Sequence, residues 1–139
     1  QGAVKVSVYY EALCPDSIGF IKNQLYPTWL ELTEENLEPD FVPYGKATQR
    51  QAPNGTWSFQ CQHGPQECKS NMEQACALNM LSNNATMQVM FITCVMSSRS
   101  PARAGQQAYS QVDQDDSMRN LLQVVCRYIA EPKPDACNN

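Results

Sequence analysis

The segment 4–25 constrains the fold most, because its hydrophobic period changes from that of a strand to that of a helix. Apolar and polar residues alternate over residues 4–10, which predicts a half-buried strand. Pro15 is a residue favoured in the first turn of a helix, and after it apolar residues recur at helical spacing up to Leu25. Cys14 is therefore predicted to lie at a strand-to-helix junction.

Cys14 is a candidate nucleophile because the first turn of a helix presents unpaired N–H groups and the positive end of the helix dipole. Both stabilise a thiolate, which is the form of cysteine that attacks a disulfide. The second cysteine of a Cys-x-x-Cys motif is absent, since Ser17 stands at its position, and the negative charge of Asp16 opposes thiolate formation. Cys-x-x-Ser is a weak motif, so an ordinary buried or bridged cysteine is the alternative interpretation.

Length and charge limit the classes of protein to which the chain can belong. Its 139 residues have the length of one domain, so residues 1–139 are predicted to form a single unit with one core. The net charge of −4 and the lack of a Lys/Arg cluster argue against nucleic acid or anionic membranes as partners. No segment has the pattern of a membrane span or a signal peptide, so we expect a mature chain without a membrane span, and no pattern indicates a cofactor.

Cysteines and glycosylation sequons indicate the secretory pathway. The chain has seven cysteines, and acceptor sequons begin at Asn54 and Asn84. An odd number leaves at least one cysteine unpaired, and if that one is Cys14, the others can form three disulfides in several connectivities. The candidates for these disulfides are Cys61, Cys68, Cys76, Cys94, Cys126 and Cys137.

The rest of the chain shows weaker patterns. After an interruption at Pro27, a helix is expected over 30–35, followed by strands over 41–45 and 57–61. The segment between these strands is expected to be a polar loop that is closed as a hairpin. Helices are expected over 66–81 and 86–96, then a poorly structured segment 97–116, and a last helix from Ser117 that ends at Pro132 and Pro134. The apolar face expected for the helix 66–81 consists of Cys68, Met72, Ala75, Cys76 and Met80. Its methionines are predicted to fill the core.

Residues 61–76 resemble the signature of the gamma-interferon-inducible lysosomal thiol reductase (GILT) family, C-Q-H-G-x-x-E-C-x-x-N-x-x-E-x-C. The matching residues are Cys61, Gln62, His63, Gly64, Glu67, Cys68, Asn71 and Cys76, with Glu73 one residue from the place of the last glutamate. The segments VYYEALCPDS, FIKNQLYPTW and FVPYGKA are similar to the family's active-site strand and turn, its following helix and its second strand. The resemblance covers roughly residues 4–96, and a signature of this length is far more specific than a short motif.

The resemblance implies an α/β (α+β) fold of the thioredoxin-like type with a helical insertion, stabilised by disulfides. Typical members reduce protein disulfides in acidic endolysosomal compartments through a Cys-x-x-Cys pair. Cys14 matches the attacking cysteine of that pair, and Ser17 takes the place of the resolving cysteine. Such folds also need a late hairpin introduced by a cis-proline, and nothing after Cys126 resembles it, because Pro132 and Pro134 lie in a charged tail. We therefore expect a fold truncated at the C-terminal hairpin, with its edge covered by the tail or by a second chain in a homodimer.

The chain lacks the resolving cysteine and the hairpin with its cis-proline, which are both catalytic parts of the family's fold. The sequence therefore predicts a GILT-like protein that has lost ordinary dithiol reductase activity and binds a protein partner. The expected location is secreted, with lysosomal as the alternative, and the family's roles in animals suggest host defence. A second hypothesis is a monothiol oxidoreductase that uses Cys14 and an external thiol, and a third is a purely structural module. A zinc site of Cys61, His63, Cys68 and Cys76 is disfavoured by its spacing, and His63 is predicted to be a loop or capping residue.

Overall fold

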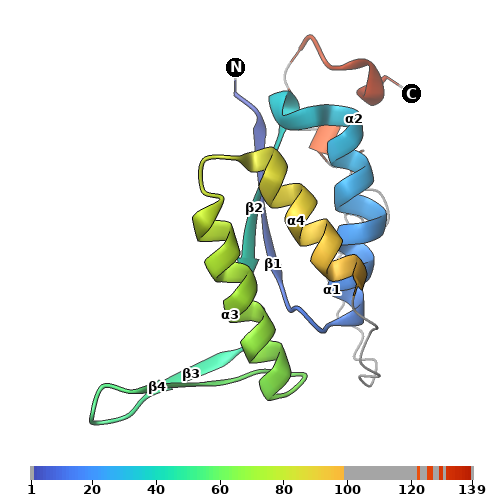
Figure 1. Cartoon of the computed structure of the whole chain (residues 1–139). Coiled ribbons are helices and arrows are strands. Elements are labelled where there is room, and N and C mark those ends of the chain that lie inside the picture. Colours follow the sequence, from blue (N-terminus) through green and yellow to red (C-terminus); the bar gives the residue numbers. More distant parts are fainter. Residues whose placement is uncertain (1, 99–121, 123–124, 127–128, 130, 139) are drawn as a thin grey trace.

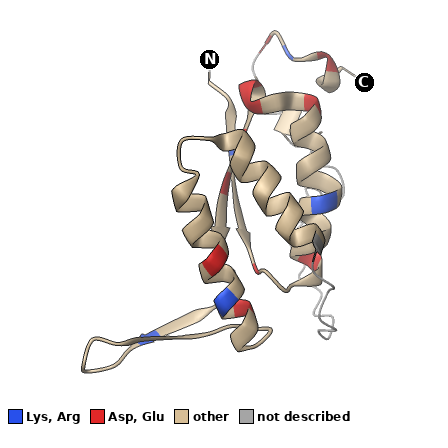
Figure 2. Cartoon of the chain, in the orientation of Figure 1, with Lys and Arg blue, Asp and Glu red and all other residues tan. Residues whose placement is uncertain are grey.

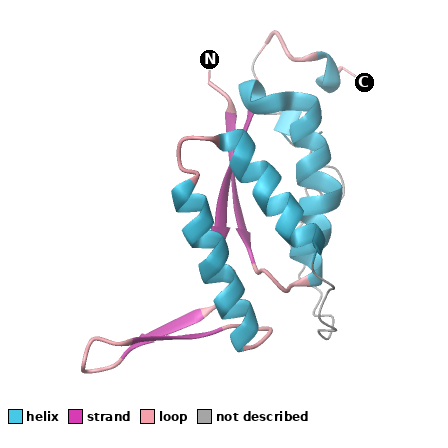
Figure 3. Cartoon of the chain, in the orientation of Figure 1, coloured by secondary structure: helices cyan, strands magenta, loops and turns pink. Residues whose placement is uncertain are grey.

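The computed structural model describes residues 2–98, 122, 125–126, 129 and 131–138 (Figure 1). Its elements are β1 (Val4–Tyr10), α1 (Pro15–Phe20), the π-helical stretch η1 (Ile21–Leu25), α2 (Tyr26–Asn36), β2 (Leu37–Pro43), β3 (Thr48–Gln51), β4 (Trp57–Gln60), α3 (Pro65–Met80), α4 (Ala85–Ser98) and the short 3₁₀ helix η2 (Asp135–Cys137). This mixture of helices and strands confirms the predicted α/β class (Figure 3).

β1 and β2 form a parallel two-stranded sheet with Val4 opposite Leu37 and Tyr10 opposite Pro43. The helical run α1–η1–α2 is the crossover between them, since parallel strands cannot be joined by a tight turn. Burial alternates along β1, which confirms the predicted half-buried strand. The second strand was expected over 41–45, but it begins four residues earlier and covers the whole length of β1.

The interruption of the helix at Pro27 is a wrong prediction. α1, η1 and α2 follow one another without a gap, and the π-helical stretch η1 ends directly before the turn that contains Pro27. Proline removes a helical N–H donor, and a local π-helical register is one way for a helix to accommodate the lost bond. The backbone instead leaves the helical region at Thr33, with φ 60° and ψ 176°, and this directs the chain toward β2.

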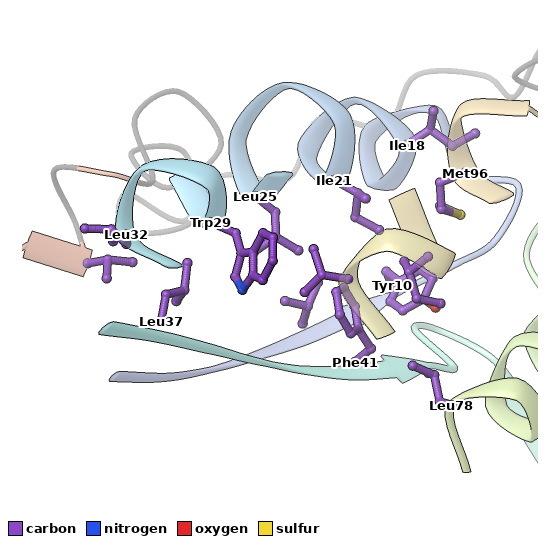
Figure 4. Close-up of a cluster of buried hydrophobic side chains, with 14 residues drawn as sticks. Tyr10, Ile18, Ile21, Leu25, Trp29, Leu32, Leu37, Phe41, Leu78 and Met96 are labelled. Atoms are coloured by element: carbon purple, nitrogen blue, oxygen red, sulfur yellow. The ribbon is translucent and has the colours of Figure 1, made fainter. Parts of the chain in front are cut away.

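The hydrophobic core lies between the sheet and the helices of the crossover and α4 (Figure 4). Tyr10 and Phe41 meet there with their rings edge to face and their centroids 6.2 Å apart. The other core residues are Val8, Ile18, Ile21, Leu25, Trp29, Leu32, Leu37, Leu78, Val89, Ile92, Met96 and Val125. Burial of these side chains is the main contribution to the stability of the fold.

The expected inward faces of α3 and α4 differ from the observed ones. Met72 and Met80 of α3 are 62% and 86% exposed, although they were predicted to fill the core. The buried residues of α3 are Glu67, Ser70, Asn71, Gln74 and Leu78. In α4 the predicted helix is confirmed, but Met87 and Met90 are exposed. A polar face of α3 is therefore turned inward, and its contacts organise the site described below.

The strand expected over 57–61 is confirmed as β4, which forms a hairpin, but its antiparallel partner β3 lies within the segment that was expected to be a polar loop, with Thr48 opposite Gln60. Every residue of both strands is exposed, and the hairpin extends away from the sheet and helices (Figure 1). Its tip contains Asn54, the first residue of one sequon. The hairpin thus adds no side chain to the main core.

The last helix was expected from Ser117, and its first residues, like most of 97–116, lie outside the described residues. Leu122, Val125 and Cys126 are helical, and Val125 is buried in the core. The peptide bond between Glu131 and Pro132 is cis, which the sequence pattern of the tail did not indicate. Within the described ranges, no strand follows α4, so the question of a C-terminal hairpin stays a prediction.

The basic residues that the structure describes are not confined to one element. Figure 2 shows the Lys and Arg residues of the described part spread over separate elements. In the same part of the chain, every helix is too short or too polar to cross a bilayer.

Candidate functional site

Cys14 lies at the predicted strand-to-helix junction, directly before α1. Its backbone is extended, with φ −75° and ψ 122°, and its carbonyl oxygen accepts the N–H of Ile18 at 3.0 Å. The Cys14 N–H donates to the carbonyl oxygen of Glu11 at 3.2 Å, which closes a turn after β1. The residue is half-buried and its thiol is not in a disulfide. Cys14 is thus not fully buried, and its backbone is fixed by these two hydrogen bonds.

Ser17 lies within the first turn of α1 and contacts the same turn. Its Oγ accepts a hydrogen bond from the backbone N–H of Glu11 at 3.2 Å. This contact links the helix to the turn that carries Cys14. The hydroxyl therefore has a structural bond at the place where the Cys-x-x-Cys pattern has its second thiol.

The buried polar face of α3 binds the end of β1 and the turn after it. Gln74 Oε1 accepts the Tyr10 hydroxyl at 2.6 Å, and Asn71 Oδ1 accepts the Ala12 N–H at 2.9 Å. Glu67 Oε2 accepts the next backbone N–H, that of Leu13, at 3.2 Å. The pairing of β1 with β2 ends at Tyr10, so these N–H groups have no strand partner and need side-chain acceptors. Burial also raises the pKa of the Tyr10 hydroxyl far above its ordinary value.

His63 lies between two buried carboxylates. Its Nδ1 is 2.6 Å from Glu67 Oε2 and 3.3 Å from Glu11 Oε2. The side chains of His63 and Glu11 are 6% exposed, and that of Glu67 is fully buried. Glu67 Oε1 also accepts the backbone N–H of His63 at 3.1 Å. The prediction that His63 is a loop residue is correct, but its ring is buried between two carboxylates.

Glu11 reaches this cluster because Gly45 leaves room for it. Gly45 has φ +57°, a conformation that residues with a Cβ rarely adopt, and a Cβ there would clash with Glu11 Cγ. The next backbone N–H, that of Lys46, donates to Glu11 Oε1 at 2.8 Å. The loop after β2 therefore sets the position of the Glu11 carboxylate.

A disulfide joins Cys61 and Cys68 on both sides of the loop that holds His63. A second disulfide joins Cys126 and Cys137. The expected third disulfide is not present, because Cys76 and Cys94 are exposed thiols on α3 and α4. The first disulfide also uses two of the three thiols that a zinc site of Cys61, His63, Cys68 and Cys76 would need.

Replacing both Cys61 and Cys68 by serine is expected to lower the free energy of unfolding by about 2–3 kcal/mol, because closing a short loop removes entropy from the unfolded chain. The measurement is urea denaturation under non-reducing conditions. The matched control is Cys76→Ser, which removes an exposed thiol from the same helix and is expected to change stability by less than about 0.5 kcal/mol. Equal unfolding midpoints for the double variant and the wild type would contradict this prediction.

The structure brings His63, from a distant segment, beside Cys14 and Glu11 of the turn after β1. One ligating atom each of Glu11, Cys14 and His63 lie within 4.8 Å of one another. A thiol beside an imidazole can pass its proton to the ring, and a protonated ring in turn stabilises a negative sulfur. Sequence reasoning missed Glu11 and Gly45. The available signal was a charged residue directly after an apolar strand, three residues before Cys14.

Comparison with known proteins decides the family. The family model described as "Gamma interferon inducible lysosomal thiol reductase (GILT)" matches residues 5–112. The chain belongs to the GILT family. The match includes the strand-to-helix junction with Cys14, the cluster around His63 and the whole of α3 and α4.

Three curated relatives show the extent of the similarity. The mouse protein named gamma-interferon-inducible lysosomal thiol reductase is 45% identical over 66% of this chain and 35% of its own length. A GILT-like protein of Anopheles gambiae is 45% identical over 61% of this chain and 34% of its own length. The goldfish (Carassius auratus) protein with the same name as the mouse one is 36% identical over 88% of this chain and 47% of its own length. The GILT-like chain described here thus spans less than half the length of these relatives.

Proposed function

We propose that this GILT-like chain exchanges disulfides through Cys14 alone, and that the reaction stops at a mixed disulfide until an external thiol releases it. The observation that carries the proposal is the half-buried Cys14 thiol beside the His63 ring, in a site where Ser17 replaces the second thiol. Membership of a family of thiol reductases supports this chemistry. Ordinary dithiol turnover is excluded from the proposal, because a serine hydroxyl does not attack disulfides.

The first step is attack by the Cys14 thiolate on one sulfur of a protein disulfide. A bond forms between Cys14 Sγ and that sulfur, the substrate S–S bond breaks, and the other substrate sulfur leaves as a thiolate that takes up a proton. A low-molecular-weight thiol then attacks the mixed disulfide. This second step restores the Cys14 thiol, and the external thiol is oxidised as part of a new disulfide with the substrate.

His63 acts in this proposal as a proton carrier next to the sulfur. Contact with the Glu67 carboxylate at 2.6 Å fixes the orientation of its ring, and the Cys61–Cys68 disulfide closes the loop around it. A ring held in this way can accept the thiol proton and return it to the leaving sulfur. Cys14 is the catalytic residue, and Glu67 is a positioning residue because it acts through His63.

The experiment uses the chain with its disulfides intact and its thiols reduced. It is incubated with glutathione disulfide, quenched with acid, and mapped by mass spectrometry. We expect the glutathione adduct at Cys14 to form at least about tenfold faster than at Cys76, because an activated thiolate reacts faster than an ordinary exposed thiol. Reduced glutathione should then remove the adduct from Cys14.

Two variants serve as matched controls in this experiment. Cys14→Ser should abolish the fast adduct, whereas Cys76→Ser should leave its rate unchanged. Insulin reduction with excess glutathione should follow the same pattern. Adduct formation that is as fast at Cys76 as at Cys14, or insulin reduction that Cys14→Ser does not slow, would contradict the proposed exchange.

Binding of a protein partner is a second candidate function, and the hairpin β3–β4 favours it. Trp57 and Phe59 are 50% and 52% exposed, and residues two apart in a strand share one face. Aromatic side chains are enriched in protein interfaces. A role in host defence and a homodimer belong to this candidate. It differs from the first candidate in that it does not need the Cys14 thiol.

We also propose a secreted or lysosomal location, with glycans on Asn54 and Asn84. The printed name of the mouse relative includes the word lysosomal. Both asparagines are exposed; Asn54 Oδ1 accepts the backbone N–H of Thr56, and Asn84 Oδ1 accepts that of Met87. A glycan is attached to the amide nitrogen, so it leaves these hydrogen bonds in place.

A further inference from the structure

We propose that Glu11, Cys14 and His63 form a binding site for a zinc ion that reversibly masks the Cys14 thiol. Their ligating atoms lie within 4.8 Å of one another. Zinc bonds of about 2.0–2.3 Å in a tetrahedral site place ligand atoms about 3–4 Å apart, so each atom has to move inward by less than about 1 Å. The residues come from the turn after β1 and from the loop before α3, both of which are held by hydrogen bonds.

The second observation is a buried carboxylate oxygen that lacks a donor. Glu11 Oε2 has no hydrogen-bond partner in the described part of the chain, although its side chain is only 6% exposed. Its neighbour His63 Nδ1 is 3.3 Å away, but that nitrogen lies nearer to Glu67 Oε2, at 2.6 Å. Leaving a buried acceptor unsatisfied is unfavourable. A cation between Glu11 and Cys14 would satisfy this oxygen.

The surroundings of His63 are those of a metal-binding histidine. Such a residue donates one ring N–H to a carboxylate, which fixes the ring and leaves the lone pair of the other nitrogen for the metal. Glu67 is that carboxylate, and it is itself held by the backbone N–H groups of Leu13 and His63. The Cys61–Cys68 disulfide restrains the same loop.

The ligand set favours zinc over the hard cations. Thiolate, imidazole and carboxylate are the three ligand types that zinc takes in proteins, whereas calcium and magnesium prefer oxygen alone. Cys14 is half-buried, which provides a route of entry for the metal. On binding, a bond forms between the metal and Cys14 Sγ, and the thiol proton goes to solvent. The coordinated sulfur is then blocked from attack on a disulfide.

The test uses the whole chain, freed of reductant under nitrogen, and two measurements with Zn²⁺ alone. Calorimetry should show one bound ion per chain. Alkylation with iodoacetamide, mapped by mass spectrometry, should become at least about tenfold slower at Cys14 when Zn²⁺ is present, because a coordinated thiolate is not free to react. Alkylation at the exposed Cys76 should stay unchanged.

Ligand variants are compared with matched controls. Cys14→Ser and His63→Gln should each weaken zinc binding at least about tenfold, and Glu67→Gln, which removes the outer carboxylate, by about 10–100-fold. Cys76→Ser and Glu73→Gln, exposed residues of the same types on α3, should bind as the wild type does. Circular dichroism shows whether each variant is folded, and the protection of Cys14 in the wild type does not depend on any variant.

Three results would overturn the zinc site: no bound ion, unchanged alkylation of Cys14 with Zn²⁺, or equal affinity in Cys14→Ser and the wild type. The site goes beyond the proposed disulfide exchange and does not depend on it. Neither calorimetry nor alkylation measures disulfide exchange. Zinc binding can therefore be found even if the glutathione experiment fails, and disulfide exchange can be found even if zinc does not bind.

Discussion

Ser17→Cys is expected to shorten the lifetime of the mixed disulfide at Cys14 by at least about tenfold in the absence of external thiol. A second thiol one turn into α1 attacks within the same molecule, and well-oriented intramolecular attack has effective molarities on the order of 10⁵ M or more. In the wild type, Ser17 Oγ only accepts the N–H of Glu11 and cannot resolve the bond. The variant should therefore release its partner and form a disulfide between Cys14 and the introduced thiol.

The measurement is the fraction of chain that remains attached to a disulfide-bonded protein, followed on non-reducing gels after an acid quench. Ser82→Cys is the matched control, because it adds a thiol at an exposed position after α3, away from the Cys14 turn. It should retain the long-lived adduct. Equal adduct lifetimes in Ser17→Cys and in the wild type would mean that Ser17 is not what stops the reaction at its first step.

Glu67→Ala is expected to lower the free energy of unfolding by about 3 kcal/mol or more, because each buried group left without its hydrogen-bond partner costs about 1–3 kcal/mol. The Glu67 carboxylate accepts the N–H groups of Leu13 and His63 and contacts the His63 ring, so its loss leaves all three without their acceptor. The loop before α3 and the turn after β1 would both lose their common anchor. This loss is a large share of the stability of a domain of this size.

The control is Glu73→Ala on the same helix. Glu73 is an exposed carboxylate whose contact with Lys69 Nζ, at 3.9 Å, is a surface ion pair, so we expect a change of less than about 1 kcal/mol. Urea denaturation of both variants with disulfides intact compares the two positions directly. If the two substitutions lowered stability by the same amount, the inward polar face of α3 would not be the anchor that we describe.

Local patterns predicted the elements with strong periodicity. β1, the start of α1, the strand β4 and the existence of α3 and α4 all follow from alternation, helical spacing and turn residues. Two predictions from local sequence were wrong for the same reason: the intrinsic propensity of a residue for helix or strand is a weak preference that tertiary contacts override. The helix continues past Pro27, which lies in α2 directly after the π-helical stretch η1. β2 starts well before Phe41 because β1 offers it a full-length parallel partner.

The faces of α3 and α4 could not be predicted from periodicity. The apolar stripe through Met72 and Met80 indicated the wrong side, because the side of α3 that turns inward is chosen by unpaired backbone N–H groups at the end of β1. Asn71, Glu67 and Gln74 satisfy groups more than fifty residues away in the sequence. No pattern within α3 contains that information.

The sequence by itself determined the family, the α/β class, the position of Cys14 at a strand-to-helix junction and the absence of its second thiol at Ser17. These are properties of residue order and local spacing. Only the tertiary structure decided that His63 and Glu11 lie beside Cys14, that Gly45 makes room for Glu11, and that Cys76 and Cys94 stay as thiols. Such contacts join segments far apart in the chain, and they depend on how β1, the loop after β2 and α3 pack together, which no local preference specifies.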